Sequence, residues 1–292
     1  MARYSRRDFI RNTLATGALV GTGTLPLLAA GAKATDWVTL GKSGVKVTRL
    51  AFGTGSRGGA VQRNLGQEQF NALVRHAYDS GIRFFETSDT YEDMHRMLGI
   101  ALKVIPRDSY RLMSKVTTDS GDPHQRFDDL RRQIDTDYFD IMLLHVQESA
   151  TWPSDSARWQ DGISEAQSRK IILSRGASVH GLPALRQVPD NKWLQVAMIR
   201  MNHIGTKMDS ESNAWEATGN VTEVVTHVKQ ARANGLGVIS MKLIGEGVFN
   251  HDDRQKAMRY AFRNAGVDCV TVGYKSPGEV DEAIANLNAA LA

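Results

Sequence analysis

The chain has 292 residues, of which 41% are hydrophobic and 23% are charged. This composition is typical of a globular protein and excludes disordered and collagen-like chains. The length suits two small domains or one domain of about 250 residues, such as an α/β barrel. Because Cys269 is the only cysteine, the chain has no internal disulfide and no cysteine-based zinc site, and no metal site is predicted.

The formal net charge of +4 comes from the N-terminal segment. Residues 1–34 carry five basic residues and one acidic residue, and the remainder of the chain is formally neutral. A nucleic-acid partner requires a basic surface, so the sequence predicts none.

The first residues resemble a twin-arginine export signal. Arg6 and Arg7 are followed by Phe9, then by the uncharged residues 13–30, and then by the small-x-small pattern Ala32-Lys33-Ala34. The resemblance predicts a signal peptide over residues 1–34, a mature domain over 35–292, and the twin-arginine export machinery as a partner. It implies export of the folded protein to the periplasm. Four threonines and three glycines in residues 13–30 argue against a stable membrane anchor.

After the signal, short apolar runs alternate with helical patterns. A hairpin is predicted at residues 37–40 and 45–47, around a turn at 41–44. Strands are predicted at 49–52, 82–86, 111–115, 140–144, 171–177, 194–200, 237–241 and 268–272. Helices are predicted at 67–79, 92–104, 124–134, 157–169, 182–188, 221–233, 252–264 and 277–291.

Eight strand–helix pairs predict an α/β fold: a closed (β/α)8 TIM barrel with an N-terminal β-hairpin. The competing fold is an open doubly wound sheet. It is disfavoured because no G-x-G-x-x-G motif joins the first strand to a helix. Residues 53–58 approach that motif, but the sequence predicts no helix directly behind them.

Four polar residues lie at the predicted carboxyl ends of three neighbouring strands, where a barrel holds its active site. They are Glu86, Tyr91, Lys115 and His145. Any one of them alone has an ordinary structural explanation, but together they suit the reduction of a carbonyl group. Tyr91 would supply a proton, with its pKa lowered by Lys115, and Glu86 would orient the lysine. Neutral His145 would donate a hydrogen bond to the carbonyl oxygen.

Three sequence stretches resemble motifs of the aldo-keto reductase family. Residues 82–91 resemble its F-D-T-A-x-x-Y segment, 112–115 its third-strand T-K segment, and 137–145 its D-Y-x-D-x-x-x-x-H segment. The resemblance covers nearly all of residues 37–292. It implies that Tyr91 is the general acid–base, Lys115 its partner and His145 the carbonyl-orienting group. Glu86 stands where the family has aspartate.

The same resemblance implies a nicotinamide dinucleotide extended across the strand ends, with NADP as the family default and NAD possible. Its expected contacts are Gly53 and Thr54 after the first barrel strand, Ser178, Met198, the segment Met241, Lys242 and Leu243, and the loop residues Lys275, Ser276, Glu279 and Glu282. Gln195 is an alternative to Met198. Glu279 stands where many NADP-preferring members carry a basic residue.

The sequence therefore predicts an oxidoreductase that reduces an aldehyde or ketone to an alcohol, or catalyses the reverse reaction. The alternative is a dinucleotide-binding sensor with little turnover. Trp152 and Trp215 are candidate apolar walls of the substrate pocket, and each is equally well explained as packing. Arg57 and Arg63 would favour an anionic carbonyl or alcohol substrate, or are simply solvated.

Overall fold

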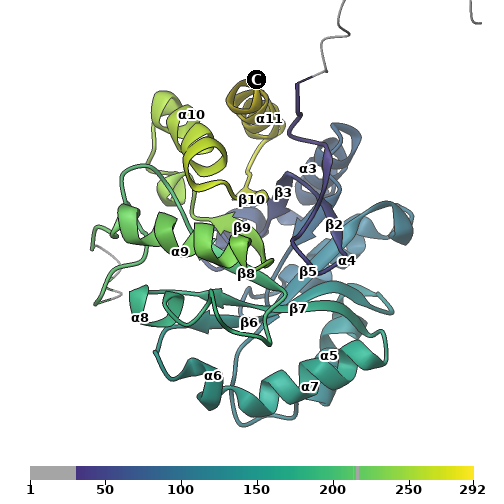
Figure 1. Ribbon diagram of the computed structural model, residues 1–292. Helices are drawn as coiled ribbons and strands as arrows, with labels where there is room; N and C mark the ends of the chain where they lie inside the picture. Colours follow the sequence, from purple (N-terminus) through teal and green to yellow (C-terminus); the bar gives the residue numbers. More distant parts are fainter. Residues whose placement is uncertain (1–30, 213, 215–216) are drawn as a thin grey trace, which may run out of the picture. The chain divides into compact units, whose positions relative to one another are not determined.

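Eight parallel strands of the chain close into a barrel, as the sequence predicts (Figure 1). The computed structural model describes residues 31–292 except 213, 215 and 216. The paired arginines, the apolar stretch and Trp215 lie outside the described residues. The strands pair around the barrel in the order β10-β3-β4-β5-β6-β7-β8-β9. Their bounds are Leu50–Gly53 (β3), Phe84–Glu86 (β4), Arg111–Val116 (β5), Phe139–Gln147 (β6), Ile172–Val179 (β7), Val196–Arg200 (β8), Gly237–Met241 (β9) and Cys269–Gly273 (β10).

Helices surround the strands and bury an apolar face against them (Figure 1). The longer ones are Gly66–Asp79 (α3), Met94–Leu102 (α4), Pro123–Ile134 (α5), Ala157–Ser168 (α7), Val221–Ala233 (α9), His251–Arg259 (α10) and Pro277–Leu291 (α11). Side chains at the N-terminal ends of α5, α9, α10 and α11 accept backbone N–H groups of the first turn. These caps satisfy donors that a helix leaves free, and they fix where each helix begins.

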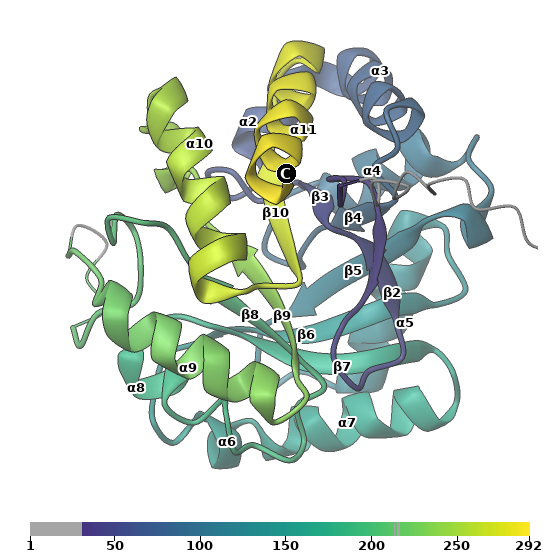
Figure 2. The ribbon, with the colours of Figure 1, turned by 45° about the horizontal axis from the view of Figure 1, so that its top comes forward.

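The predicted hairpin closes the amino-terminal end of the barrel (Figure 2). Its strands are Trp37–Thr39 (β1) and Lys46–Thr48 (β2), which pair antiparallel. Leu40, Val45 and Val47 pack into the same buried cluster as Phe84 and Ile239 from the barrel interior. The hairpin therefore seals one end of the barrel and leaves the carboxyl ends of the strands to form the site.

Side chains inside the barrel lie in layers because successive residues of a strand point to opposite faces. One apolar layer contains Phe84, Met113, Leu143, Val196, Ile239 and Cys269. Two residues further along the same strands come Glu86, Lys115, His145, Met198, Met241 and Thr271. The polar residues of the predicted site thus form the next layer, directly above a dry apolar floor.

Several local predictions differ from the structure. The helix predicted at 182–188 is a single turn, Leu182–Leu185 (α8), with Pro183 in that turn. The helix predicted at 252–264 ends as α10 at Arg259, and a wider π-helical segment, Tyr260–Ala265, follows before Gly266 adopts a left-handed φ of 75°. A one-turn helix, Ala60–Arg63 (α2), lies behind residues 53–58, where none was expected. Another short helix, Trp152–Asp155 (α6), precedes α7.

Within the part of the chain that the structure describes, no helix has the length and apolar character needed to cross a membrane. The same residues contain no group of histidine, cysteine or carboxylate side chains that could hold a metal ion.

The tight closure of the barrel predicts a large effect of Gly176→Ala. A Cβ atom at Gly176 in β7 would lie 1.9 Å from the carbonyl oxygen of Val196 in β8. We expect a loss of at least ~3 kcal/mol in the free energy of unfolding, because two paired strands would have to separate. Urea unfolding measures this loss. Gly278→Ala is the control, since nothing lies within 4 Å of its Cβ in helix α11 and alanine favours a helix; equal stability of the two variants would contradict the prediction.

Candidate active site

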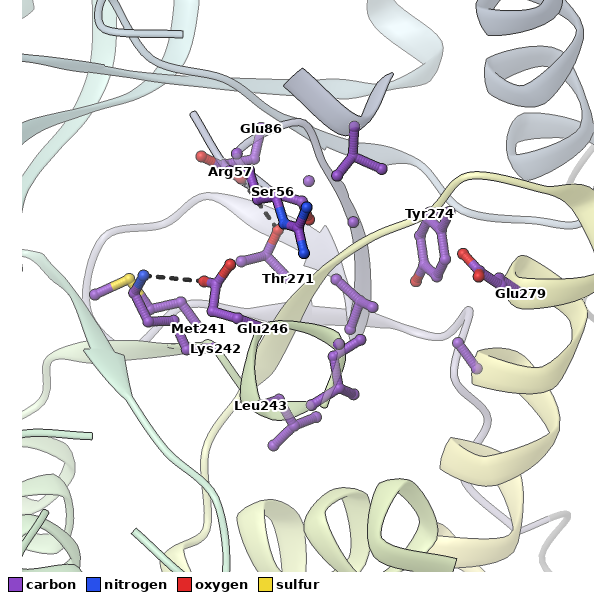
Figure 3. A pocket seen from close by; sticks show the side chains of 18 of the residues that line it. Ser56, Arg57, Glu86, Met241, Lys242, Leu243, Glu246, Thr271, Tyr274 and Glu279 are labelled. Carbon is purple, nitrogen blue, oxygen red and sulfur yellow. Dashed lines mark hydrogen bonds and ion pairs between the residues drawn. The ribbon is translucent and has the colours of Figure 1, made fainter. Parts of the chain in front are cut away.

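A cavity of about 590 Å³ opens at the carboxyl ends of the strands (Figure 3). Eleven of the predicted site residues line it: Gly53, Glu86, Tyr91, His145, Met198, Met241, Lys242, Leu243, Lys275, Glu279 and Glu282. A cavity of this size, with apolar walls and converging polar groups, is typical of a small-molecule site. Lys115 lies directly beneath it and is 1% exposed.

The Lys115 ammonium is held by Glu86, as the sequence predicts. Lys115 Nζ donates to Glu86 Oε1 and to the carbonyl oxygen of Thr87, the latter at 3.1 Å. Burial lowers the pKa of Lys115 well below its usual value, and Lys242 acts in the same direction. Contact with a carboxylate favours the charged lysine, so Glu86 is the group that keeps the proton on Nζ.

No other carboxylate of the described chain competes for Lys115. Asp89 accepts hydrogen bonds from Arg126 at 2.7 Å and from the Thr117 backbone at 2.9 Å. Gly53 makes the room that the longer glutamate needs, because a Cβ atom there would lie 3.0 Å from Glu86 Oε2 and 2.6 Å from Thr271 Oγ1. Thr271 in turn donates to Glu86 Oε2 at 3.3 Å.

Tyr91 lies against Lys115, but its acidity differs from the expectation. Lys115 Nζ lies 4.8 Å from the centre of the Tyr91 ring. Burial nevertheless raises the pKa of the Tyr91 hydroxyl, and the carboxylates of Glu246 and Asp89 raise it further. The expectation of a lowered pKa is therefore wrong: burial and these two carboxylates raise it, even though Lys115 is positioned to stabilise the phenolate. Tyr91 therefore holds its proton at neutral pH, as a proton donor must.

Two hydroxyl groups hold one side of the His145 ring. Ser88 Oγ lies 2.8 Å and Thr90 Oγ1 lies 3.2 Å from His145 Nδ1. Ser88 Oγ accepts the Thr90 backbone N–H at 3.4 Å, and the nearest acceptor for its single proton is Nδ1. We therefore assign the ring proton to Nε2, which makes no hydrogen bond to the described residues and belongs to the cavity wall.

His145 stays neutral. Burial lowers its pKa to about 2, and the cations Lys115 and Lys242 contribute to the shift. A second histidine, His180, lies beside it, with ring centres 6.5 Å apart, and burial lowers its pKa well below the usual value too. Because the ring is neutral and carries its proton on Nε2, it can donate a hydrogen bond to a carbonyl oxygen and remain uncharged.

The side chains beside this cluster suit a ligand with a flat aromatic ring and negatively charged phosphate groups. Met198 and Met241 lie next to Ser178, whose buried hydroxyl contacts the Met241 sulfur at 3.8 Å. Lys242 forms an ion pair of 2.9 Å with Glu246 inside the cavity (Figure 3). Arg57 and Arg254 also line the cavity. This set fits a dinucleotide, with thioethers for an aromatic ring and cations for its phosphates.

Acidic and basic side chains both line the end of the cavity beside α11. Glu279 accepts the Lys275 backbone N–H at 2.8 Å and lies 3.6 Å from its ammonium. Glu282 is held by Arg254 at 2.7 Å. Glu279 thus occupies the backbone N–H and the ammonium group of Lys275, a residue that the resemblance gives as a dinucleotide contact.

Several predicted residues lie beside the site without lining it. Thr54 Oγ1 donates to the Glu86 carbonyl at 3.0 Å and joins two strands, and Ser276 caps α11. Gln195 lies before β8 and accepts the Arg175 N–H at 3.1 Å, so Met198 is the residue at the cavity. Trp152 is packing, because its Nε1 donates to the Ala184 carbonyl at 3.2 Å. Arg63 pairs with Glu92 at 3.2 Å, away from the cavity that Arg57 lines.

Sequence reasoning missed Glu246, Arg254, His180 and Thr271, which all line the cavity. Thr271 could have been predicted from the sequence, because it lies two residues beyond Cys269 on the same strand and so points to the same inner face of the barrel. Glu246 and Arg254 had none, since both follow β9 in a loop and a helix whose direction the sequence does not specify.

Comparison with known proteins identifies the family. The model of the aldo/keto reductase family matches residues 49–258. The chain belongs to the aldo/keto reductase family.

Individual relatives are distant. An aldo-keto reductase of Pseudomonas aeruginosa has a TM-score of 0.72 at 19% identity, over 89% of this chain and 98% of that one. The holo form of an aldo-keto reductase from Bacillus halodurans has a TM-score of 0.67 at 18% identity, over 86% and 90% of the two chains. At these identities the likeness shows the fold alone.

Two plant proteins are similar in sequence. A soybean protein named probable aldo-keto reductase 1 is 24% identical over 231 residues, which are 73% of this chain and 60% of that protein. L-galactose dehydrogenase of Arabidopsis thaliana is 35% identical over 121 residues, which are 36% of each chain. The matches thus span between about a third and three fifths of these relatives.

The hydroxyls at His145 Nδ1 generate a prediction about the ring's tautomer. Ser88→Ala leaves only Thr90 at Nδ1, and we expect carbonyl reduction to slow about three- to tenfold, the value of one buried hydrogen bond. The double variant with Thr90→Val should slow it further, because the proton is then free to move to Nδ1. Nitrogen-15 NMR of the imidazole reports the tautomer directly. A ring that keeps its proton on Nε2 in the double variant would contradict the assignment.

Proposed function

We propose that this chain is an oxidoreductase that reduces an aldehyde or ketone to an alcohol with a nicotinamide dinucleotide, and that it catalyses the reverse reaction when alcohol is in excess. The observation that carries the proposal is the juxtaposition at one cavity of Tyr91, the buried Lys115–Glu86 pair and neutral His145. These groups provide a proton donor, its charged neighbour and a hydrogen-bond donor for the carbonyl oxygen.

The nicotinamide ring, when bound, supplies the hydride. The residues of the chain do the rest. His145 Nε2–H orients the carbonyl oxygen, and the Tyr91 hydroxyl transfers its proton to the same oxygen as negative charge develops there. Lys115, 4.8 Å from the tyrosine ring, stabilises the phenolate that remains. Glu86 keeps Lys115 protonated throughout.

We propose that Met198 and Met241 pack against the nicotinamide and that Lys242, Arg57 and Arg254 hold the phosphates. Lys275 and Glu282 would hold the adenosine end. In support, all seven residues line one continuous cavity that reaches from His145 to α11.

The hydroxyl of Tyr91 is expected to be essential. Tyr91→Phe should reduce kcat for carbonyl reduction by ~10² or more, the usual contribution of general acid catalysis, while the Kd of the dinucleotide changes little. Because burial, Glu246 and Asp89 raise the pKa of Tyr91, the wild-type rate should stay level through neutral pH and fall only in alkaline solution. Steady-state kinetics across pH tests both statements. Full activity of Tyr91→Phe would assign proton transfer to another group.

We propose that both NADP and NAD bind, with NADP as the family default. The negative charge of Glu279 would repel the 2′-phosphate of NADP and weaken its binding. Glu279→Gln removes the negative charge beside Lys275 and should tighten NADPH binding severalfold with little change for NADH. Fluorescence titration at low salt measures both Kd values. Asp281→Asn is the matched control, because Asp281 lies on the same helix but pairs with His76 at 2.7 Å. Equal effects of the two substitutions would contradict the role of Glu279.

The substrate is proposed only as a class. One relative is named for L-galactose, a hydroxyaldehyde in its open form, and the match covers 36% of this chain. Arg57 at the cavity would favour a substrate with a negative charge. A panel of neutral and acidic hydroxyaldehydes therefore comes first, with plain aldehydes as the reference.

We further propose that the protein is exported folded to the periplasm by the twin-arginine route, without a stable membrane anchor. The support is the order of the paired arginines, the uncharged stretch and the small-x-small pattern. A cofactor bound before export would have to stay bound. Copurified dinucleotide that no carbonyl substrate oxidises would favour the alternative function, a sensor.

A further inference from the structure

Residues 33–36 form a tight turn at the start of the described barrel unit. The Asp36 N–H donates to the Lys33 carbonyl oxygen at 3.1 Å, which closes the turn around Ala34 and Thr35. The peptide bond between Ala34 and Thr35 is thus the central bond of the turn. The small-x-small pattern Ala32-Lys33-Ala34 would place a signal-peptidase cut at this bond.

Hydrogen bonds and side-chain packing hold the turn to the barrel. The Ala34 N–H donates to Asn288 Oδ1 of α11 at 2.8 Å, and the Ala34 carbonyl accepts the Leu50 N–H of β3 at 2.9 Å. Ala34 is 0% exposed. The Thr35 side chain packs on Gly81, where a Cβ atom would lie 2.9 Å from the Thr35 methyl group.

A peptidase must draw several residues around the cut bond into an extended conformation. At Ala34–Thr35 this would require breaking the turn and both hydrogen bonds of Ala34, and exposing a buried side chain. In a protein that is already folded when the peptidase meets it, this bond is protected. Gly31 and Lys33, by contrast, are exposed.

The bond before Lys33 is held less tightly, because Ala32 is only half-buried and the bond's N–H makes a single hydrogen bond, which lies within the turn. Ala30, Gly31 and Ala32 form another small-x-small pattern, and no hydrogen bond within the described chain holds the Ala32 carbonyl or N–H. The Lys33 N–H already donates to Asp36 Oδ2 at 2.7 Å. Cutting there would turn this nitrogen into an α-ammonium group in contact with a carboxylate.

We propose that the export signal is removed by hydrolysis of the Ala32–Lys33 bond, so that the mature protein begins at Lys33. Water adds across the bond, leaving a carboxylate on Ala32 and an ammonium on Lys33, which pairs with Asp36. The turn and the contacts of Ala34 stay intact. The inference rests on the proposed export of the folded protein.

The full chain is produced in a bacterium with an active twin-arginine system, and the periplasmic protein is analysed by N-terminal sequencing and intact mass. The expected first residue is Lys33. A first residue of Thr35 or Ala32 would overturn the inference. Absence of any processed periplasmic protein, with the wild-type signal behaving like Arg6→Lys/Arg7→Lys, would instead overturn the proposed export.

Two neighbouring substitutions test the assignment of the bond independently. Ala30→Leu places a bulky residue at the third position before the Ala32–Lys33 bond and should cause unprocessed precursor to accumulate. Ala29→Leu is the matched control and should be processed at Lys33 like the wild type. Normal processing of Ala30→Leu would overturn the inference. Both positions precede the proposed cut, so the mature protein has the same sequence in the two variants.

Discussion

The alternation of side chains along eight closed strands is the constraint on which the site depends. Because every second residue of a barrel strand points inward, the residue two places after an apolar interior residue must also point inward. Phe84, Met113 and Leu143 thereby direct Glu86, Lys115 and His145 into one layer. Glu86, Lys115 and His145 gain an apolar floor and fixed backbone positions from this arrangement, and Tyr91 joins them from the segment between β4 and α4.

Burial is the largest cause of the pKa shifts of three titratable groups at the site. It lowers the pKa of His145 and of Lys115 and raises that of Tyr91. Each shift favours the neutral form, and only Lys115 has an opposite charge in direct contact to counter it. The result is a neutral donor at His145, a protonated phenol at Tyr91 and the buried Lys115–Glu86 ion pair. This is the set of states that carbonyl reduction requires.

The sequence was sufficient to predict the barrel, the hairpin and the central cluster, because all of these follow from short-range periodicity. β9, α9 and α11 have the predicted bounds. The raised pKa of Tyr91 could not be predicted, because it depends first on how deeply the hydroxyl is buried and then on the nearby Glu246 and Asp89. The Glu246 side chain is positioned by a loop in which Lys242 and Glu246 both adopt left-handed backbone angles, with φ of 54° and 58°. Non-glycine residues seldom do so, and nothing in their identity indicates it. The role of Trp152 was equally open, since a buried indole and a pocket wall have the same sequence pattern.

The fit between Gly53 and Glu86 links two positions that are 33 residues apart in the chain and adjacent in the barrel. A Cβ atom at position 53 would lie 2.6 Å from Thr271 Oγ1 and 3.0 Å from Glu86 Oε2, so a side chain there would crowd the glutamate carboxylate and its threonine partner. Substitutions at these positions are therefore non-additive. The effect of exchanging the acid at position 86 therefore depends on the residue at position 53, and a side chain at 53 would have to be accommodated by Thr271 as well.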